Sequence, residues 1–158
     1  MSGTNIQHAT FVIERRFWTT PARTFRFWSE RDLKERWNAC HPDWSVIDEA
    51  FDFRVGGTEA KRWRTADESE QTFTAHYLDI VAPDRIVYAF EMSLSGERVS
   101  VSLATVALRP ADGQTLMTYT EQIAFFGSRN ALDQRIAGTG SGFERLTELI
   151  ALEWPAPS

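Results

Sequence analysis

The sequence predicts an α+β fold, in which a curved antiparallel sheet of seven strands wraps around one long C-terminal helix. Three observations lead to this prediction. Segments with a two-residue hydrophobic period recur through the middle of the chain, separated by tight-turn residues. Two short helical patterns follow the first such segment. A final amphipathic stretch is the only long element available to cover one face of the sheet.

The N-terminal third begins with a strand and continues into two helices. Thr10–Trp18 alternates apolar, aromatic and charged residues with the period of a strand. Thr20 is a suitable N-cap, and Pro21 suits the first helical position because its missing N–H has no partner there. The spacing of apolar residues after that point predicts two consecutive short helices, roughly over 21–29 and 31–38.

Six further strands are expected between the helices and the C-terminal segment. Even spacing and tight turns favour an antiparallel meander. We expect Gly56-Gly57 to form a two-residue turn, in which both positions tolerate positive φ. The predicted strands are Val46–Val55, Thr58–Arg64, Phe73–Ile80, Ile86–Met92, Val99–Leu108 and Leu116–Phe126.

The C-terminal segment returns to helical spacing, with an apolar stripe that runs from Leu132 to Ile150. Gly138-Thr139-Gly140-Ser141-Gly142 interrupts this stripe, at a cost of up to ~1 kcal/mol per glycine relative to alanine. It lacks the Gly-Lys-Ser/Thr of a phosphate loop. The small residues should instead let the helix kink or approach the sheet and leave room for a ligand.

Composition and charge limit the classes of protein to which the chain can belong. The 158 residues are 42% hydrophobic and 25% charged, which favours one domain over 1–158, with a core at about 11–152 and a frayed tail at 153–158. The net charge of −5 argues against nucleic acid as the main partner. No apolar run approaches the ~18 residues of a membrane helix. The N-terminus lacks the pattern of a secretory signal, and with the lone Cys40 this predicts a cytoplasmic protein.

Several motifs then resemble a known family. FVIERRFWTTPARTFRFWSERDLKERW, FDFRVGG, APDRIVYAFEM, VSLATVAL, MTYTEQIAFF and R-x-x-GTGSGFERL follow one another as in the family named for the activator of the heat-shock chaperone ATPase. The match is to its prokaryotic single-domain branch, within the SRPBCC superfamily of START-like and birch-pollen-allergen-like proteins. It covers about Phe11 to Leu152. The chain departs from the branch at Asn38-Ala39-Cys40-His41-Pro42, where a longer tryptophan or glycine element is usual.

The resemblance implies a helix-grip fold with an apolar cavity between the sheet and the C-terminal helix. We therefore expect binding of a small, largely apolar molecule, without a metal or cofactor. Arg15, Tyr119 and Glu121 would orient a polar group of the ligand. The apolar walls would come from Phe17, Trp28, Trp37, Phe53, Tyr88, Phe90 and Phe143. In the alternative, Arg15 pairs with Glu121 inside a solid core and no cavity exists.

Other functions stay open at this stage. The chain could bind a heat-shock chaperone, in the stress response that the family name suggests, or a transcriptional regulator, through an exposed patch that includes Trp18, Trp44 or Trp63. Glu121 beside Tyr119 is the one catalytic candidate, as the base of a cyclase, isomerase or hydrolase. Cys40-His41-Pro42-Asp43 is better explained as a loop at a pocket mouth than as a nucleophile or metal site. Either a monomer or a homodimer is compatible with the sequence.

Overall fold

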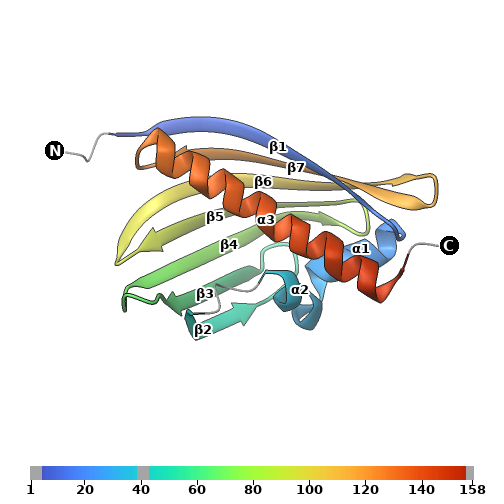
Figure 1. Ribbon diagram of the computed structural model, residues 1–158, viewed down its shortest axis with the longest axis horizontal. Helices are drawn as coiled ribbons and strands as arrows, with labels where there is room; N and C mark the ends of the chain where they lie inside the picture. Colours follow the sequence, from blue (N-terminus) through green and yellow to red (C-terminus); the bar gives the residue numbers. More distant parts are fainter. Residues whose placement is uncertain (1–4, 39–42, 156–158) are drawn as a thin grey trace.

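The computed structural model describes residues 5–38 and 43–155, and within them seven strands and three helices are found (Figure 1). The predicted α+β class and the predicted order of elements are confirmed. In chain order the elements are β1 (Gln7–Phe17), α1 (Pro21–Ser29), α2 (Arg31–Trp37), β2 (Ser45–Phe51), β3 (Thr58–Arg64), β4 (Glu70–Val81), β5 (Arg85–Leu94), β6 (Glu97–Ala111), β7 (Gln114–Phe125) and α3 (Arg129–Glu153).

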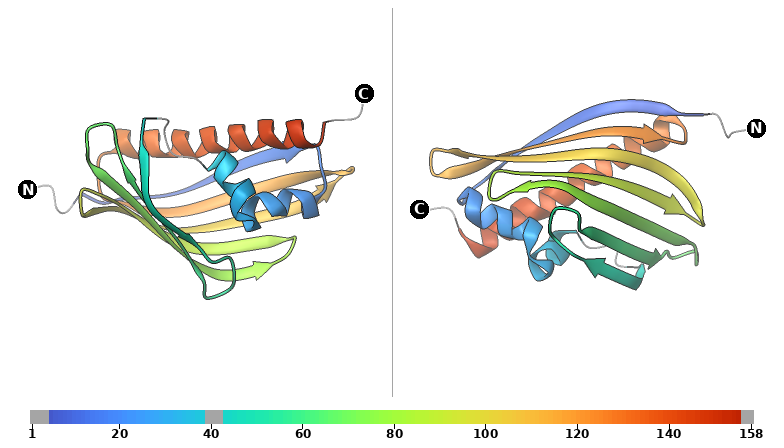
Figure 2. Two further views of the ribbon diagram at one scale, coloured as in Figure 1. Left: turned by 90° about the horizontal axis from the view of Figure 1, so that it is seen from below. Right: turned by 180° about the vertical axis from the view of Figure 1, so that it is seen from behind.

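The strands form one antiparallel sheet in the order β1-β7-β6-β5-β4-β3-β2. Six strands are neighbours along the chain, and β1 joins them by pairing with β7, where Ile13 lies opposite Tyr119. Figures 1 and 2 show the sheet curving around α3, which crosses its concave face. The two short helices lie beside α3 on the same face. The helix-grip arrangement expected from the sequence is therefore present.

The core lies between the concave face of the sheet and α3. Because successive strand residues point to opposite faces, alternate residues of β7 face the helix and are buried, among them Met117, Tyr119 and Ile123. The amphipathic helix α3 contributes four buried residues to this core: Leu132, Phe143, Leu146 and Ile150. Phe17, at the end of β1, is also fully buried in this core.

The two short helices begin and end as their sequences predict. Thr20 caps α1 by accepting a hydrogen bond from the backbone N–H of Arg23, and Pro21 occupies the first turn. The indole N–H of Trp37 donates to the Phe27 carbonyl at 2.8 Å and so joins α2 to α1. Arg145 of α3 donates to the Trp37 carbonyl at 3.0 Å, which fixes the end of α2 to the long helix.

The β2–β3 connection differs from the prediction. Strand β2 ends at Phe51 instead of Val55, and a loop of residues 52–57 leads into β3. The loop leaves the β2–β3 ladder because it bonds to β4 instead: Gly56 N–H donates to the Tyr77 carbonyl, and Tyr77 N–H donates to the Gly57 carbonyl. Of these two glycines only Gly56 has a positive φ, at +84°. Gly57 is required for another reason, since a Cβ there would overlap the Asp52 carbonyl oxygen.

The glycine-rich stretch does not interrupt the long helix. Helix α3 runs continuously from Arg129 to Glu153, through Gly138, Gly140 and Gly142 (Figure 1). The long C-terminal helix predicted from the sequence is confirmed, because tertiary packing on both sides of the glycines outweighs their poor propensity. A Cβ at Gly138 or Gly142 would meet no atom within 4 Å, so space is left beside the helix at this point.

Trp154 departs from the predicted frayed tail. Its ring packs against Phe27 in an edge-on contact, with a centroid separation of 5.9 Å. The guanidinium carbon of Arg23 lies 5.3 Å from the same ring centroid, within cation–π range. The chain is therefore fixed to α1 through Trp154, immediately after the helix ends.

These observations predict opposite effects for two Gly→Ala substitutions. Gly57→Ala should lower the free energy of unfolding by about 1–3 kcal/mol, because the new Cβ would overlap the Asp52 carbonyl oxygen and force the backbone apart. Gly138→Ala, in open space on α3, should raise it by up to about 1 kcal/mol through helix propensity. Urea unfolding followed by circular dichroism measures both. Equal stability of the two variants would contradict the close approach at Gly57.

Candidate functional site

A hollow lined by many buried core residues lies between the concave face of the sheet and the helices. It has a volume of about 490 Å³, within the range of small-molecule sites. Helices α1, α2 and α3 contribute to its wall, together with strands β3, β4, β5 and β7. It is lined by Trp28, Lys34, Trp37, Asn38, Trp44, Trp63, Gln71, Phe73, Tyr88, Phe90, Met92, Tyr119, Glu121, Gln134, Arg135, Gly138, Thr139, Gly142 and Phe143.

The glycines of α3 help to keep this pocket open. Gly138 and Gly142 are one helical turn apart and both line the pocket, where side chains would otherwise project. The aromatic rings around them are packed against one another: Phe143 contacts Tyr119, Trp28 and Trp37 at centroid separations of 4.9, 6.0 and 5.8 Å. The hollow is therefore bounded by aromatic rings packed on one another and by a part of α3 where two of the lining residues are glycines.

A buried carboxylate lies in the pocket wall. Glu121 is 0% exposed, yet both of its oxygens are satisfied. Oε1 accepts from the Tyr119 hydroxyl at 2.6 Å, and Oε2 accepts from the Ser102 hydroxyl at 2.7 Å and from Arg135 Nη2 at 3.0 Å. Arg135 also donates to Ser100 at 3.2 Å and covers the ring of Phe90. The cluster ties α3 to β6 and β7 and neutralises the buried charge.

The tyrosines of the site stay protonated. Burial raises the pKa of Tyr88 far above its ordinary value, and the carboxylates of Glu121 and Glu59 act in the same direction. Burial likewise raises the pKa of Tyr119 well above 10, supported by Tyr88 and Glu121. Both phenols are therefore neutral hydrogen-bond donors at any physiological pH, rather than candidate bases.

A second buried ion pair borders the same pocket. Lys34 of α2 is 6% exposed and Glu59 of β3 is 3% exposed, and their Nζ and Oε1 atoms are 2.5 Å apart. The Tyr77 hydroxyl donates to the same Oε1 at 2.7 Å. Burial, followed by the charge of Glu59, raises the pKa of Tyr77 far above its ordinary value. The ammonium group also lies 5.4–6.0 Å from four aromatic ring centroids, those of Trp28, Phe51, Tyr77 and Tyr88.

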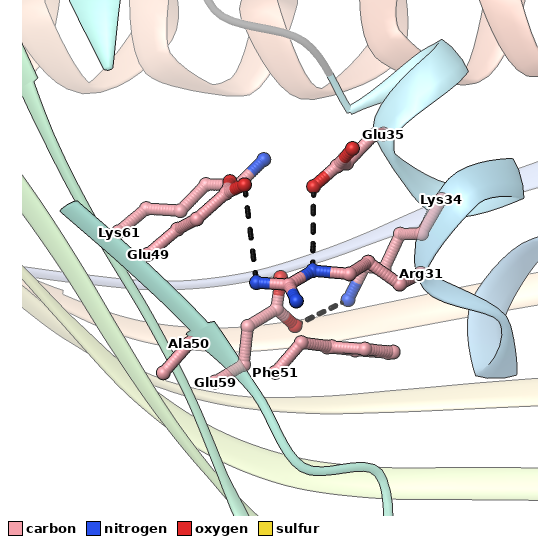
Figure 3. Close-up of a pocket in the computed structure, with 8 residues that line it drawn as sticks. All are labelled: Arg31, Lys34, Glu35, Glu49, Ala50, Phe51, Glu59 and Lys61. Atoms are coloured by element: carbon pink, nitrogen blue, oxygen red, sulfur yellow. Dashed lines mark hydrogen bonds and ion pairs between the residues drawn. The ribbon is translucent and has the colours of Figure 1, made fainter. Parts of the chain in front are cut away.

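A second, smaller hollow also borders Lys34, between α2, β2 and β3 (Figure 3). Figure 3 shows Arg31 between Glu35 and Glu49, with contacts of 3.6 and 3.9 Å. The free volume is about 10 Å³, close to that of a single water molecule, so this cluster has no room for a ligand. Burial raises the pKa of Glu35 above its usual 4.5, assisted by a hydrogen bond to Glu49 and its charge. We therefore regard the cluster as structural.

Most of the residues expected at the site are brought together. Each of the following lines the 490 Å³ pocket: Trp28, Trp37, Tyr88, Phe90, Tyr119, Glu121 and Phe143.

Three of the residues expected at the site lie elsewhere. Phe17 is packed in the core. Phe53 lies on the 52–57 loop, where it contacts Phe25 of α1 and Tyr77 of β4. Arg15 pairs with Glu144 of α3, with Nε and Oε1 2.8 Å apart.

The alternative pairing of Arg15 with Glu121 is wrong. On β1, Arg15 lies opposite Met117, two residues along the strand from Tyr119 and four from Glu121. Its side chain reaches the exposed Glu144 on α3 instead, and Arg135 takes the place beside Glu121. Glu121 is thus paired inside the core, as the alternative required, but a hollow of ligand size is present beside the pair.

The sequence reasoning missed Lys34, Arg135 and Trp63 as parts of the site. Arg135 precedes the glycine run by three residues, which was a usable signal for a residue beside the pocket. Lys34 and Lys61 are the only lysines of the chain, and both are buried. Trp63 is buried too, so it is not available on the exposed patch suggested for a protein partner, whereas Trp18 is about half exposed.

The structure offers no metal site among residues 5–38 and 43–155, where no three His, Cys, Asp or Glu side chains converge. Cys40, His41 and Pro42 lie outside the described residues. In the described part of the chain, every helix is too short or too polar to cross a membrane.

Comparison with known proteins gives a consistent result. The model of the family described as "Activator of Hsp90 ATPase homolog 1-like protein" matches residues 18–151. A solved structure from Rhizobium leguminosarum is 41% identical, with 92% of this chain and 96% of that chain covered and a TM-score of 0.86. One from Rhizobium loti is 35% identical, with 91% and 98% covered and a TM-score of 0.83. One from Rhodobacter sphaeroides shares the fold, with 18% identity, 94% and 99% covered and a TM-score of 0.73. No curated protein matches the chain.

Breaking the Lys34–Glu59 pair should be costly. Lys34→Met leaves the Glu59 carboxylate buried without its cation, so we expect the free energy of unfolding to fall by about 3–5 kcal/mol. The double variant Lys34→Met/Glu59→Leu removes the stranded charge and should be clearly more stable than Lys34→Met alone. Urea unfolding of the three proteins measures this. A loss below about 1 kcal/mol for Lys34→Met would contradict a buried pair.

Glu35 should make stability depend on pH. Its pKa is raised in the folded protein, so its favourable contribution is complete below its ordinary pKa of 4.5 and is lost as the pH rises through the raised value. Glu35→Gln should therefore stabilise the protein near neutral pH, by less than ~1 kcal/mol because the side chain is 40% exposed, and should give no gain near pH 4. Urea unfolding at both pH values tests this, with Glu97→Gln, an exposed residue, as the control. A gain for Glu35→Gln that is equal at both pH values would contradict it.

Proposed function

The chain belongs to the family of Activator of Hsp90 ATPase homolog 1-like proteins, and we propose that it binds a small, largely apolar molecule in the pocket between the sheet and α3. The observation that supports this is the pocket itself: about 490 Å³ of space lined by nine aromatic residues and seven polar or charged ones. This combination is typical of sites that bind small molecules.

The energetics of such a site favour apolar ligands. Burying apolar surface contributes about 25 cal/mol per Å², from which the lost freedom of the ligand is subtracted. The rings of Trp28, Trp37 and Phe143 already contact one another, so little side-chain ordering is needed when a ligand enters. A preformed wall retains more of the burial energy as affinity.

The geometry supports binding in preference to catalysis. A general base needs a free lone pair that faces the substrate. The Glu121 carboxylate accepts from Tyr119, Ser102 and Arg135, so its hydrogen-bonding capacity is largely used within the protein. Its role in our proposal is to hold Tyr119 and Arg135 in place.

A chaperone- or regulator-binding module is the other function that the family suggests. The three tryptophans expected on its docking patch differ in exposure. Trp63 is buried in the pocket wall, Trp44 is partly buried and Trp18 is about half exposed. We therefore give ligand binding precedence.

We also assign the protein to the cytoplasm, because a single cysteine is compatible with the reducing conditions there.

The proposal is tested by filling the pocket from the helix side. Gly142→Leu adds a side chain where a Cβ meets no atom within 4 Å, and Leu is a far better helix former than Gly. We expect unchanged or raised thermal stability, together with a loss of about tenfold or more in affinity for the neutral fluorescent probe N-phenylnaphthylamine. Fluorescence titration measures the affinity.

The matched control is Ser141→Leu, which adds the same side chain to the next position of α3, exposed and outside the pocket wall. It should bind the probe as wild type does. Wild-type protein that fails to bind the probe, or equal binding by Gly142→Leu and wild type, would contradict the proposed function.

A further inference from the structure

Two tryptophans in the wall of the pocket have indole N–H groups without an acceptor. Trp28 of α1 is 2% exposed and Trp63 of β3 is 8% exposed, and both line the 490 Å³ pocket. Among the described residues neither Nε1 atom has a hydrogen-bond partner. Trp37, in the same wall, differs: its N–H donates to the Phe27 carbonyl at 2.8 Å.

Buried donors without partners are unusual in folded proteins, because the group loses its hydrogen bond to water and receives nothing in return. Two such donors in the wall of one pocket suggest that a ligand supplies the acceptor. An indole N–H donates only, so the matching ligand group is a carbonyl, ether or similar acceptor. Both Nε1 atoms are buried, so the ring has to turn toward the bound molecule to complete the bond.

The charges around the pocket constrain the ligand further. Lys34 is paired with Glu59, and Arg135 is paired with Glu121, so the two cations and two carboxylates balance. An ionised ligand placed among them would be buried without a counter-ion, which is strongly unfavourable. A neutral ligand disturbs neither pair.

We infer that Trp28 and Trp63 are specificity-determining residues, and that the pocket takes a neutral apolar molecule carrying a carbonyl or ether oxygen. This inference rests on the proposed function. The aromatic wall binds the apolar frame of the molecule. The indole N–H groups distinguish an oxygen-bearing compound from a hydrocarbon of the same shape.

Fluorene and fluorenone form a matched pair for the test, since they share a flat frame and differ in one carbonyl group. Isothermal titration calorimetry of wild-type protein should give an affinity about tenfold higher for fluorenone than for fluorene. The anion of fluorenecarboxylic acid should bind more weakly than fluorene. The preference for fluorenone should fall in Trp28→Phe or Trp63→Phe, and should be lost in the double variant.

Trp37→Phe is the control, because it removes a similar ring volume but an N–H that already has an acceptor. It should keep the fluorenone preference even if both affinities change. Equal binding of fluorene and fluorenone by wild type would overturn this inference and leave the proposed function intact, as would a preference that survives in the double variant. Tighter binding of the anion would overturn the assignment of a neutral ligand. No binding of any of these compounds or of N-phenylnaphthylamine would overturn both proposals.

Discussion

The packing of the helices on the sheet depends on the need to neutralise carboxylates that are buried away from water. Glu59 and Glu121 both lie on the concave face of the sheet and are almost fully buried. Each is satisfied by a cation from the helices, Lys34 from α2 and Arg135 from α3. Because a buried charge without its partner is so costly, these two pairs hold the helices at fixed places on the sheet.

The pocket is a consequence of this arrangement. The helices are tied to the sheet at points where charges meet, and aromatic rings bridge the remaining distance. Beside Gly138 and Gly142 of α3, no atom of residues 5–38 and 43–155 fills the space next to the rings. Tyr119 connects the two features, since it donates to Glu121 and packs on Phe143.

Much of the fold could be predicted from the sequence, because strand alternation and helix stripes are local signals. The limits of α1 and α2 follow from Thr20, Pro21 and the apolar spacing, and most of the aromatic wall follows from the resemblance to a known family. The partner of Arg15 was not predictable, since it depends on the register between β1 and β7 and on the position of α3. The same holds for the 52–57 loop, whose hydrogen bonds go to Tyr77 on β4. Lys34 was missed although lysine is rare in the chain, because composition cannot say where a residue is buried.

The glycine run also determines which part of α3 has the lowest resistance to local unfolding. Leu132 fixes one end of the helix, and Leu146 and Ile150 fix the other, while three of the five residues from Gly138 to Gly142 are glycines, which have poor helix propensity. Local opening of a protein is concentrated where buried contacts are fewest. Local opening of α3 is therefore expected first in this segment, while both ends of the helix stay docked.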